Sequence, residues 1–105
     1  MYTVLRRAAE FGKPVMVTEN GLADAADRQR ARFVEDHLRQ ALRALRDGVD
    51  LRGYLYWSLM DNFDWAEGFT KRFGLAETDF HSPNKTRTLR PSAETYRRIV
   101  AANAL

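Results

Sequence analysis

The sequence contains no cysteine, only two histidines and no long apolar run. Without cysteine the chain has no disulfide framework, no thiol nucleophile and no thiolate metal site. His37 and His81 stand far apart without neighbouring ligand residues, so we predict no metal site and no cofactor. The longest nearly uninterrupted apolar run covers residues 54–60, far short of the roughly 18 residues that a membrane helix needs. We therefore expect no membrane partner.

A concentrated block of one charge is also missing. The formal net charge is +3, and the arginines alternate with acids through residues 27–47. This pattern is typical of a solvated helix face and argues against a nucleic-acid partner. The first residues lack the apolar segment and the small-residue cleavage site of a signal peptide. From this and the absence of cysteine we expect a cytoplasmic location.

The chain is organised around residues 14–21, PVMVTENG. Residues 15–17 form an apolar run between a proline and an Asn-Gly pair, which predicts a strand buried on both faces. The strand ends in one carboxylic acid, Glu19. Such a carboxylate is either solvated where the strand reaches the surface or a catalytic acid at the rim of a parallel sheet. This stretch alone favours the solvated carboxylate, and the rest of the chain decides between the two interpretations.

Three helices and a second strand accompany this stretch. Helical periodicity and end signals predict helices over residues 2–11, 28–47 and 91–103. The longest helix carries an apolar stripe of Val34, Leu38, Ala41, Leu42 and Leu45. Residues 51–58 are rich in aromatics and predict a strand. Helix, strand, helix, strand is a βα repeat, so we predict an α/β fold with a parallel sheet.

Two strands cannot by themselves hide both faces and both edges of a sheet. Either partner strands come from another chain, or the 105 residues belong to a larger barrel. We favour the barrel. Residues 59–75 show neither a helical nor a strand periodicity. Long irregular segments in compact domains are usually functional. Residues 76–90 predict an extended piece followed by a polar, basic loop.

The segment after the second strand is rich in side chains that suit a sugar. Aromatic rings cover the apolar faces of a pyranose, and carboxylates, amides and indole N–H groups bond its hydroxyls. The residues of this kind are Trp57, Asp61, Asn62, Phe63, Asp64, Trp65, Glu67 and Phe69. Taken singly, each is better explained as a core aromatic or a solvated loop acid. Their density over about a dozen positions favours carbohydrate binding.

Three motifs together resemble the C-terminal part of glycoside hydrolase family 1, the β-glucosidases and their relatives. They are TENG at residues 18–21, YWSLMDNFDWAEGF at 56–69 and KRFGL at 71–75. The resemblance implies the last two βα units of a (β/α)8 TIM barrel, with residues 1–105 supplying strands seven and eight and their helices. It also implies retaining hydrolysis of β-glycosides.

The resemblance further implies a role for each matching residue. Glu19 corresponds to the nucleophile that forms a glycosyl-enzyme, and Trp57 to the aromatic platform beneath the sugar. Trp65 corresponds to an indole donor to a ring hydroxyl, and Phe73 to an aromatic at the site entrance. Asp64 stands where a glutamate that grips two hydroxyls is commoner. Its reach is shorter by about 1.5 Å, which affects the preferred sugar and leaves the reaction type unchanged.

The second carboxyl group of a retaining mechanism is missing, because the family's asparagine–glutamate–proline motif does not occur in the sequence. We therefore expect the isolated chain to be inactive. As an alternative to a piece of an enzyme, the chain has a structural or sugar-binding role, or self-associates through exposed strand edges. A 6-phospho-β-glycosidase is disfavoured, because that branch has small residues in place of Asp64 and Trp65.

Overall fold

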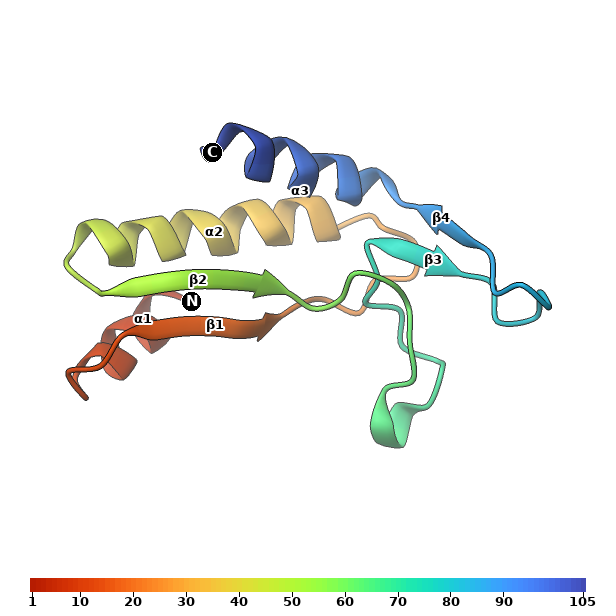
Figure 1. Cartoon of the computed structure of the whole chain (residues 1–105), viewed down its shortest axis with the longest axis horizontal. Coiled ribbons are helices and arrows are strands. Elements are labelled where there is room, and N and C mark those ends of the chain that lie inside the picture. The colour runs from red at the N-terminus through yellow and green to blue at the C-terminus, as the bar shows by residue number, and fades with distance from the viewer.

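Two parallel strands, covered on one face by helices, form the first half of the molecule, and a short antiparallel strand pair leads to the last helix (Figure 1). The computed structural model describes all 105 residues. In chain order the elements are α1 (Tyr2–Ala9), β1 (Val15–Asn20), α2 (Arg30–Arg46), β2 (Leu51–Tyr56), the 3-10 helix η1 (Trp65–Glu67), β3 (Ala76–Thr78), β4 (Arg87–Leu89) and α3 (Pro91–Ala102).

The predicted helices and the predicted parallel strand pair are confirmed. β1 pairs with β2 in parallel, and α2 forms the connection between them. Residues 76–90 differ from expectation, because β3 and β4 pair with each other as an antiparallel ribbon. Each of these strands is too short to carry a pattern of its own, so the pairing is a tertiary feature.

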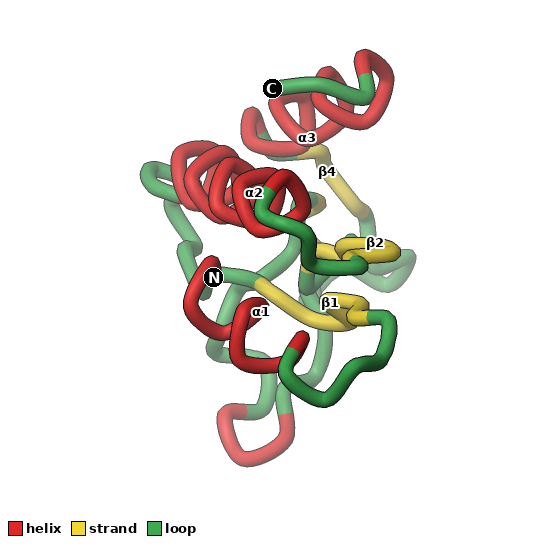
Figure 2. Tube along the Cα trace, turned by 90° about the vertical axis from the view of Figure 1, so that its left-hand side faces the viewer, coloured by secondary structure: helices red, strands yellow, loops and turns green.

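The core lies between α1, α2 and the covered face of the sheet. Its buried centre consists of Leu5, Ala41, Ala44 and Val49, against which Val15, Val17 and Leu51 pack from the strands. Figure 2 shows α1 and α2 on the same side of the two strands. The apolar stripe predicted for α2 is wrong at one position. Leu45 is 46% exposed and Ala44 is buried instead.

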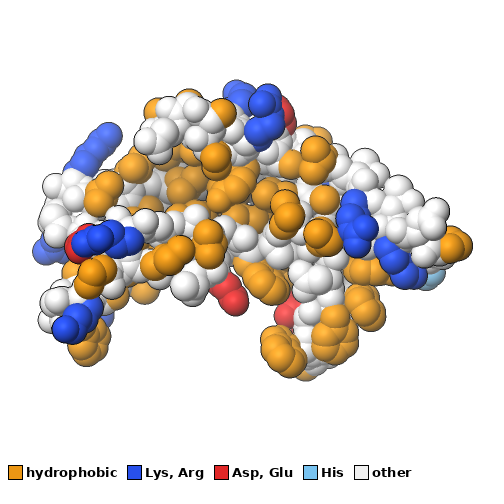
Figure 3. Space-filling view, in the orientation of Figure 1, with side chains coloured by type: hydrophobic (Ala, Val, Ile, Leu, Met, Phe, Trp, Pro, Cys, Tyr) orange, Lys and Arg blue, Asp and Glu red, His pale blue; other side chains and the backbone are white.

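The expectation that residues 15–17 are buried on both faces is also wrong for this chain. Along β1, half-buried and exposed side chains alternate at first, and Met16 on the uncovered face is 49% exposed. Leu55 on β2 is 50% exposed. Apolar side chains are accordingly visible along the strands in Figure 3. The helices cover one face only, and we call the other the open face.

The second half of the molecule extends from the C-terminal ends of β1 and β2. The loop with η1 lies beyond these ends, and Figures 1 and 2 both place it far from α2 and α3. The β3–β4 ribbon then leads back to α3, which lies beside α2. No helix is long and apolar enough to cross a bilayer.

The core packing predicts a sharp contrast between two neighbouring residues of α1. We expect Leu5→Ala to lower the free energy of unfolding by about 2–5 kcal/mol, because it leaves a cavity between the helices. Val4→Ala is the matched control, since Val4 is 68% exposed. It should change the free energy of unfolding by less than about 0.5 kcal/mol. Urea unfolding followed by circular dichroism measures both values. Equal losses in the two variants would contradict the packing.

Candidate active site

The C-terminal ends of β1 and β2 are in direct backbone contact. The Trp57 backbone N–H donates to the Asn20 carbonyl oxygen at 3.0 Å. Gly21 comes so close that an added Cβ would lie 1.7 Å from the Trp57 carbonyl oxygen. Only glycine fits a backbone approach of this kind. The TENG segment and Trp57, 36 or more positions apart in the sequence, therefore meet at one edge of the sheet.

The register of the two strands contains an extra residue near the end of β1. Val17 pairs with Tyr54 and Asn20 with Tyr56, so three steps along β1 match two steps along β2. Such a β-bulge re-aims the side chains beside it and is common next to active sites. Here it decides the face on which Glu19 lies.

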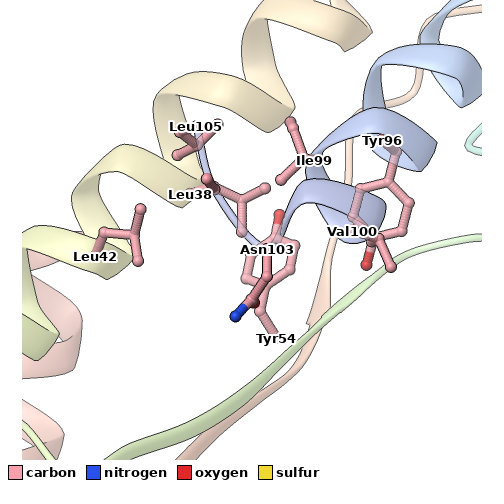
Figure 4. A pocket seen from close by; sticks show the side chains of 9 residues that line it. Leu38, Leu42, Tyr54, Tyr96, Ile99, Val100, Asn103 and Leu105 are labelled. Atoms are coloured by element: carbon pink, nitrogen blue, oxygen red, sulfur yellow. The ribbon is translucent and has the colours of Figure 1, made fainter.

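Contacts on either side of the bulge identify that face. Val17 packs toward the helices. Asn20 lies on the same side, because its Oδ1 accepts a hydrogen bond from the Tyr54 hydroxyl at 2.8 Å, and Tyr54 faces α2 and α3 (Figure 4). Thr18 and Glu19, which lie between, therefore belong to the open face, and both are exposed. Without the bulge, strict alternation would turn Glu19 toward the helices.

Trp57 shares the open face with Glu19. The Tyr56 ring lies 6.0 Å from the ring of Tyr96 in α3, so Tyr56 faces the helices. Because side chains alternate along a strand, the next residue, Trp57, faces the other way. The structure thus brings a carboxylate and an indole together at neighbouring strand ends, on the same side of the sheet.

The loop that follows Trp57 carries Asp64 and Trp65 at its tip. The Asp64 N–H donates to the Gly68 carbonyl oxygen at 2.7 Å, which closes a tight turn around η1. Trp65 is 86% exposed and Asp64 is partly buried. Phe73 lies at the base of the loop, where its carbonyl oxygen accepts a hydrogen bond from the Tyr56 hydroxyl at 3.1 Å. No hydrogen bond or ion pair joins Glu19 to these residues.

Asp61, which the sequence grouped with the side chains that suit a sugar, is not free to bind one, because its carboxylate is completely buried. Arg90 forms a forked ion pair with it at 3.0 and 3.1 Å, and the Gly74 N–H donates to it at 2.9 Å. Burial alone would raise the pKa of Asp61, but the hydrogen bonds from Arg90 and Gly74 outweigh burial and hold the pKa below its ordinary value. Asp61 therefore stays ionised and holds the loop in place.

Arg30 forms a second buried polar cluster beside the first. Its fully buried guanidinium pairs with Asp27 and donates to the Arg72 carbonyl oxygen at 2.8 Å. Asp27 in turn accepts hydrogen bonds from the N–H and the hydroxyl of Ser92 at 2.8 and 2.7 Å. The cluster joins the segment after β1 to α2, to the loop and to the start of α3.

Sequence reasoning missed both arginines, although one signal was available. Arg30 lies in the first turn of α2, and Arg90 directly precedes α3. A cation at a helix N-terminus is unfavourable next to the helix dipole, so it indicates a nearby acid that compensates. The acids Asp27 and Asp61 are 3 and 29 positions away, respectively.

An apolar hollow lies on the helix side and contains none of the predicted site residues (Figure 4). It has a volume of about 240 Å³ between α2, β2 and α3 and is lined by apolar side chains together with Tyr54, Tyr96 and Asn103. It has no carboxylate or histidine. No three His, Asp or Glu side chains lie close enough together to hold a metal ion.

A parallel strand pair with helices on one face, and with an acid and an indole at the C-terminal strand ends, is the arrangement of α/β barrel enzymes. The family model of Glycosyl hydrolase family 1 matches residues 2–105. The chain therefore belongs to glycosyl hydrolase family 1.

Individual relatives support this assignment. A β-galactosidase of Sulfolobus acidocaldarius is 48% identical over 95 residues, which are 90% of this chain and 19% of that protein. The β-glucosidase of Pyrococcus furiosus superposes with a TM-score of 0.95 at 44% identity, over 99% of this chain and 22% of its own. A Thermotoga maritima β-glucosidase in complex with glucoimidazole superposes with a TM-score of 0.89 at 36% identity, over 99% of this chain and 26% of its own.

These similarities confirm the predicted fold class, which is part of a (β/α)8 barrel. The chain spans about a fifth of the length of the curated β-galactosidases that it matches. The open face and the free strand edges have a simple explanation in this fold, since a closed barrel of eight strands leaves neither exposed.

The contact at Gly21 can be tested through Trp57. In a Trp65→Phe background Trp57 is the only tryptophan, because the chain has two. We expect Gly21→Ala to push the strand ends apart, to shift the Trp57 emission to longer wavelength and to cost about 1–3 kcal/mol of stability. Gly12→Ala is the control for the emission, because no atom lies within 4 Å of its Cβ position; its φ of +63° makes alanine cost about 1–2 kcal/mol of stability there without moving Trp57. An unchanged Trp57 emission in Gly21→Ala would contradict the close approach.

The buried Asp61–Arg90 pair predicts acid sensitivity. An unfolded aspartate has a pKa of about 3.9, and the folded state holds Asp61 below this value. The folded state therefore binds fewer protons, so the stability due to Asp61 is complete above that pKa and is lost as the pH falls toward the folded-state value.

We expect Asp61→Asn to lower stability at neutral pH by about 3–5 kcal/mol, because Arg90 is left unpaired. The variant should also show a shallower loss of stability below about pH 4. Urea midpoints between pH 6 and 3 measure this slope. Asp36→Asn, which removes an exposed carboxylate of α2, should retain a slope close to that of the unaltered chain. A steep slope in Asp61→Asn would show that other acids dominate.

Proposed function

We propose that the chain is the C-terminal part of a retaining β-glycosidase of the β-glucosidase type, with Glu19 as its nucleophile. The observation that carries the proposal is the shared open face of Glu19 and Trp57, in a chain that belongs to glycosyl hydrolase family 1. Strands β1 and β2 would then be the seventh and eighth strands of the barrel. The substrate is a β-glucoside or a related β-glycoside.

The reaction proceeds in two displacements. The Glu19 carboxylate attacks the anomeric carbon, and the bond to the aglycone oxygen breaks as that oxygen takes a proton from an acid. Water then attacks the anomeric carbon of the glycosyl-enzyme and gives a proton to the group that acted as the acid in the first displacement. This step releases the sugar and the free Glu19 carboxylate. Retaining enzymes hold the two carboxyl groups about 5 Å apart. The acid/base residue comes from a part of the barrel outside this chain.

Four residues of this chain contribute to binding the sugar and holding its reacting carbon. Trp57 offers its indole face to the apolar side of the pyranose, as aromatic rings do at sugar sites. Asp64 accepts hydrogen bonds from two hydroxyls, and the Trp65 indole N–H donates to one. Phe73 lines the entrance. Contacts of this kind increase the rate when they strengthen in the transition state.

The proposal predicts that Glu19 becomes covalently labelled. We expect the 105-residue chain alone to show no turnover of an aryl β-glucoside. A chimera in which it replaces the matching segment of the P. furiosus β-glucosidase should be active, and a 2-fluoro glycoside should modify Glu19. Glu19→Gln should reduce kcat by several orders of magnitude, as measured with the aryl glucoside and peptide mass spectrometry.

Glu10→Gln is the matched control, since Glu10 is an exposed acid in the turn after α1, and it should retain the activity of the chimera. Labelling of another acid would overturn the role of Glu19. Full turnover by the 105-residue chain would overturn the proposal that the acid/base residue lies outside this chain.

A second candidate function is self-association without catalysis. It is supported by the exposed Met16 and Leu55 on the open face, and by a groove of about 410 Å³ between α1 and the free edge of β1. An exposed edge of this kind is a template for another strand. Sedimentation equilibrium of the purified chain and its affinity for glucose distinguish this role from a monomer that binds sugar. The cytoplasmic location stays a prediction.

A further inference from the structure

The loop that carries Asp64 and Trp65 is connected to the rest of the molecule by two stems. The first stem, residues 58–61, follows Trp57, and the second, residues 72–76, leads into β3. The stems run side by side, because the Leu75 N–H donates to the Ser58 carbonyl oxygen at 2.9 Å and the Asp61 N–H to the Ala76 carbonyl oxygen at 3.0 Å.

The tip between the stems, residues 62–71, makes few contacts beyond itself. Its hydrogen bonds join tip residues to one another, apart from those of the Asn62 amide, which reaches back to the first stem. The one ring contact outside is between Phe69 and Phe80, at 4.6 Å between centroids. The direction in which the tip points is therefore decided mainly by the stems.

A single carboxylate holds both stems. Asp61, the last residue of the first stem, accepts the Gly74 N–H of the second stem at 2.9 Å and lies 3.5 Å from the Arg72 guanidinium. The same carboxylate receives the forked pair from Arg90 at 3.0 and 3.1 Å, and the Thr78 N–H at 3.4 Å. Its donors thus come from the second stem, from β3 and from the residue that precedes α3.

The contacts of Asp61, which we call the clamp, hold the two stems in close backbone contact. A Cβ added at Gly74 would lie 2.2 Å from the Asp61 nitrogen, so the two backbones are already at their closest approach. Arg90 also donates to the Gly74 carbonyl oxygen at 2.8 Å. Each stem is therefore held through backbone as well as side-chain groups, and a change at Asp61 affects both.

We propose that Asp61, held by Arg90, is a positioning residue that sets the placement of Asp64 against the sugar. The inference rests on the proposed glycosidase function and assigns Asp61 no contact with substrate. Only three positions separate Asp61 from Asp64, so a shift of the clamped stem passes directly to the tip. Displacements of about 1 Å can reduce turnover about 100-fold.

The test is a double-mutant cycle between the clamp and the tip, in the active chimera with the P. furiosus barrel. The variants are Asp61→Asn, Asp64→Ala and their combination, with kcat and KM expressed per active site titrated with the 2-fluoro glycoside. Titration removes the effect of misfolded protein. We expect Asp61→Asn to lower kcat/KM about 10- to 100-fold when Asp64 is present, and less than about 3-fold when Asp64 is already alanine.

Two further variants keep the result interpretable. Arg90→Lys retains the charge but loses the fork, and should show the same dependence on Asp64 if Asp61→Asn does not fold. Glu94→Gln is the control, because Glu94 is also an acid in a forked pair with an arginine, Arg97, and its hydrogen bonds reach neither stem. It should leave kcat/KM per titrated site within about 3-fold of the unaltered chimera.

The outcomes separate the two proposals. Losses from Asp61→Asn or Arg90→Lys that are equal with and without Asp64 overturn the positioning role, while labelling of Glu19 keeps the proposed function. Absence of labelling in the unaltered, folded chimera overturns the proposed function, and the positioning role with it.

Discussion

The parallel pairing of β1 with β2, closed on one face by α2, is the constraint on which the rest of the structure depends. It puts the C-terminal ends of both strands at one edge, where the Gly21 backbone touches Trp57 without room for a side chain. The covered face holds the small apolar core. The uncovered face holds Glu19 and Trp57. The proposed nucleophile would need access to substrate, and the open side of the sheet is where it could have it.

Buried charges, alongside buried apolar residues such as Leu75 and Ala76, hold the second half of the molecule in place. Asp61 with Arg90 and Asp27 with Arg30 join the loop, the ribbon and α3 to the strand ends. Buried ion pairs add little net stability compared with apolar packing. They do require a defined geometry, because each donor must meet its acceptor. This suits the role that we propose for the loop, which is to present polar groups to a sugar.

Much of the fold followed from local patterns. Val34 and Ala41 on α2 carry a helical apolar period, and the run of residues 15–17 favours a strand, so the elements and their parallel order were predictable. The motifs around Glu19 and Trp57 identified the family. Three features were not predictable, because each depends on residues distant in the sequence. They are the β-bulge, the burial of Ala44 in place of Leu45, and the burial of Asp61.

The sequence by itself determined which elements form, which family the chain belongs to and which side chains are available for chemistry, since these depend on residue types and short spacings. Only the tertiary structure decided which face each side chain occupies. One extra residue in β1 moves Glu19 from the helix side to the open face, and one distant arginine turns Asp61 from an apparent sugar ligand into an anchor. Both outcomes depend on pairings between separate segments, and such pairings leave no periodic trace in the sequence.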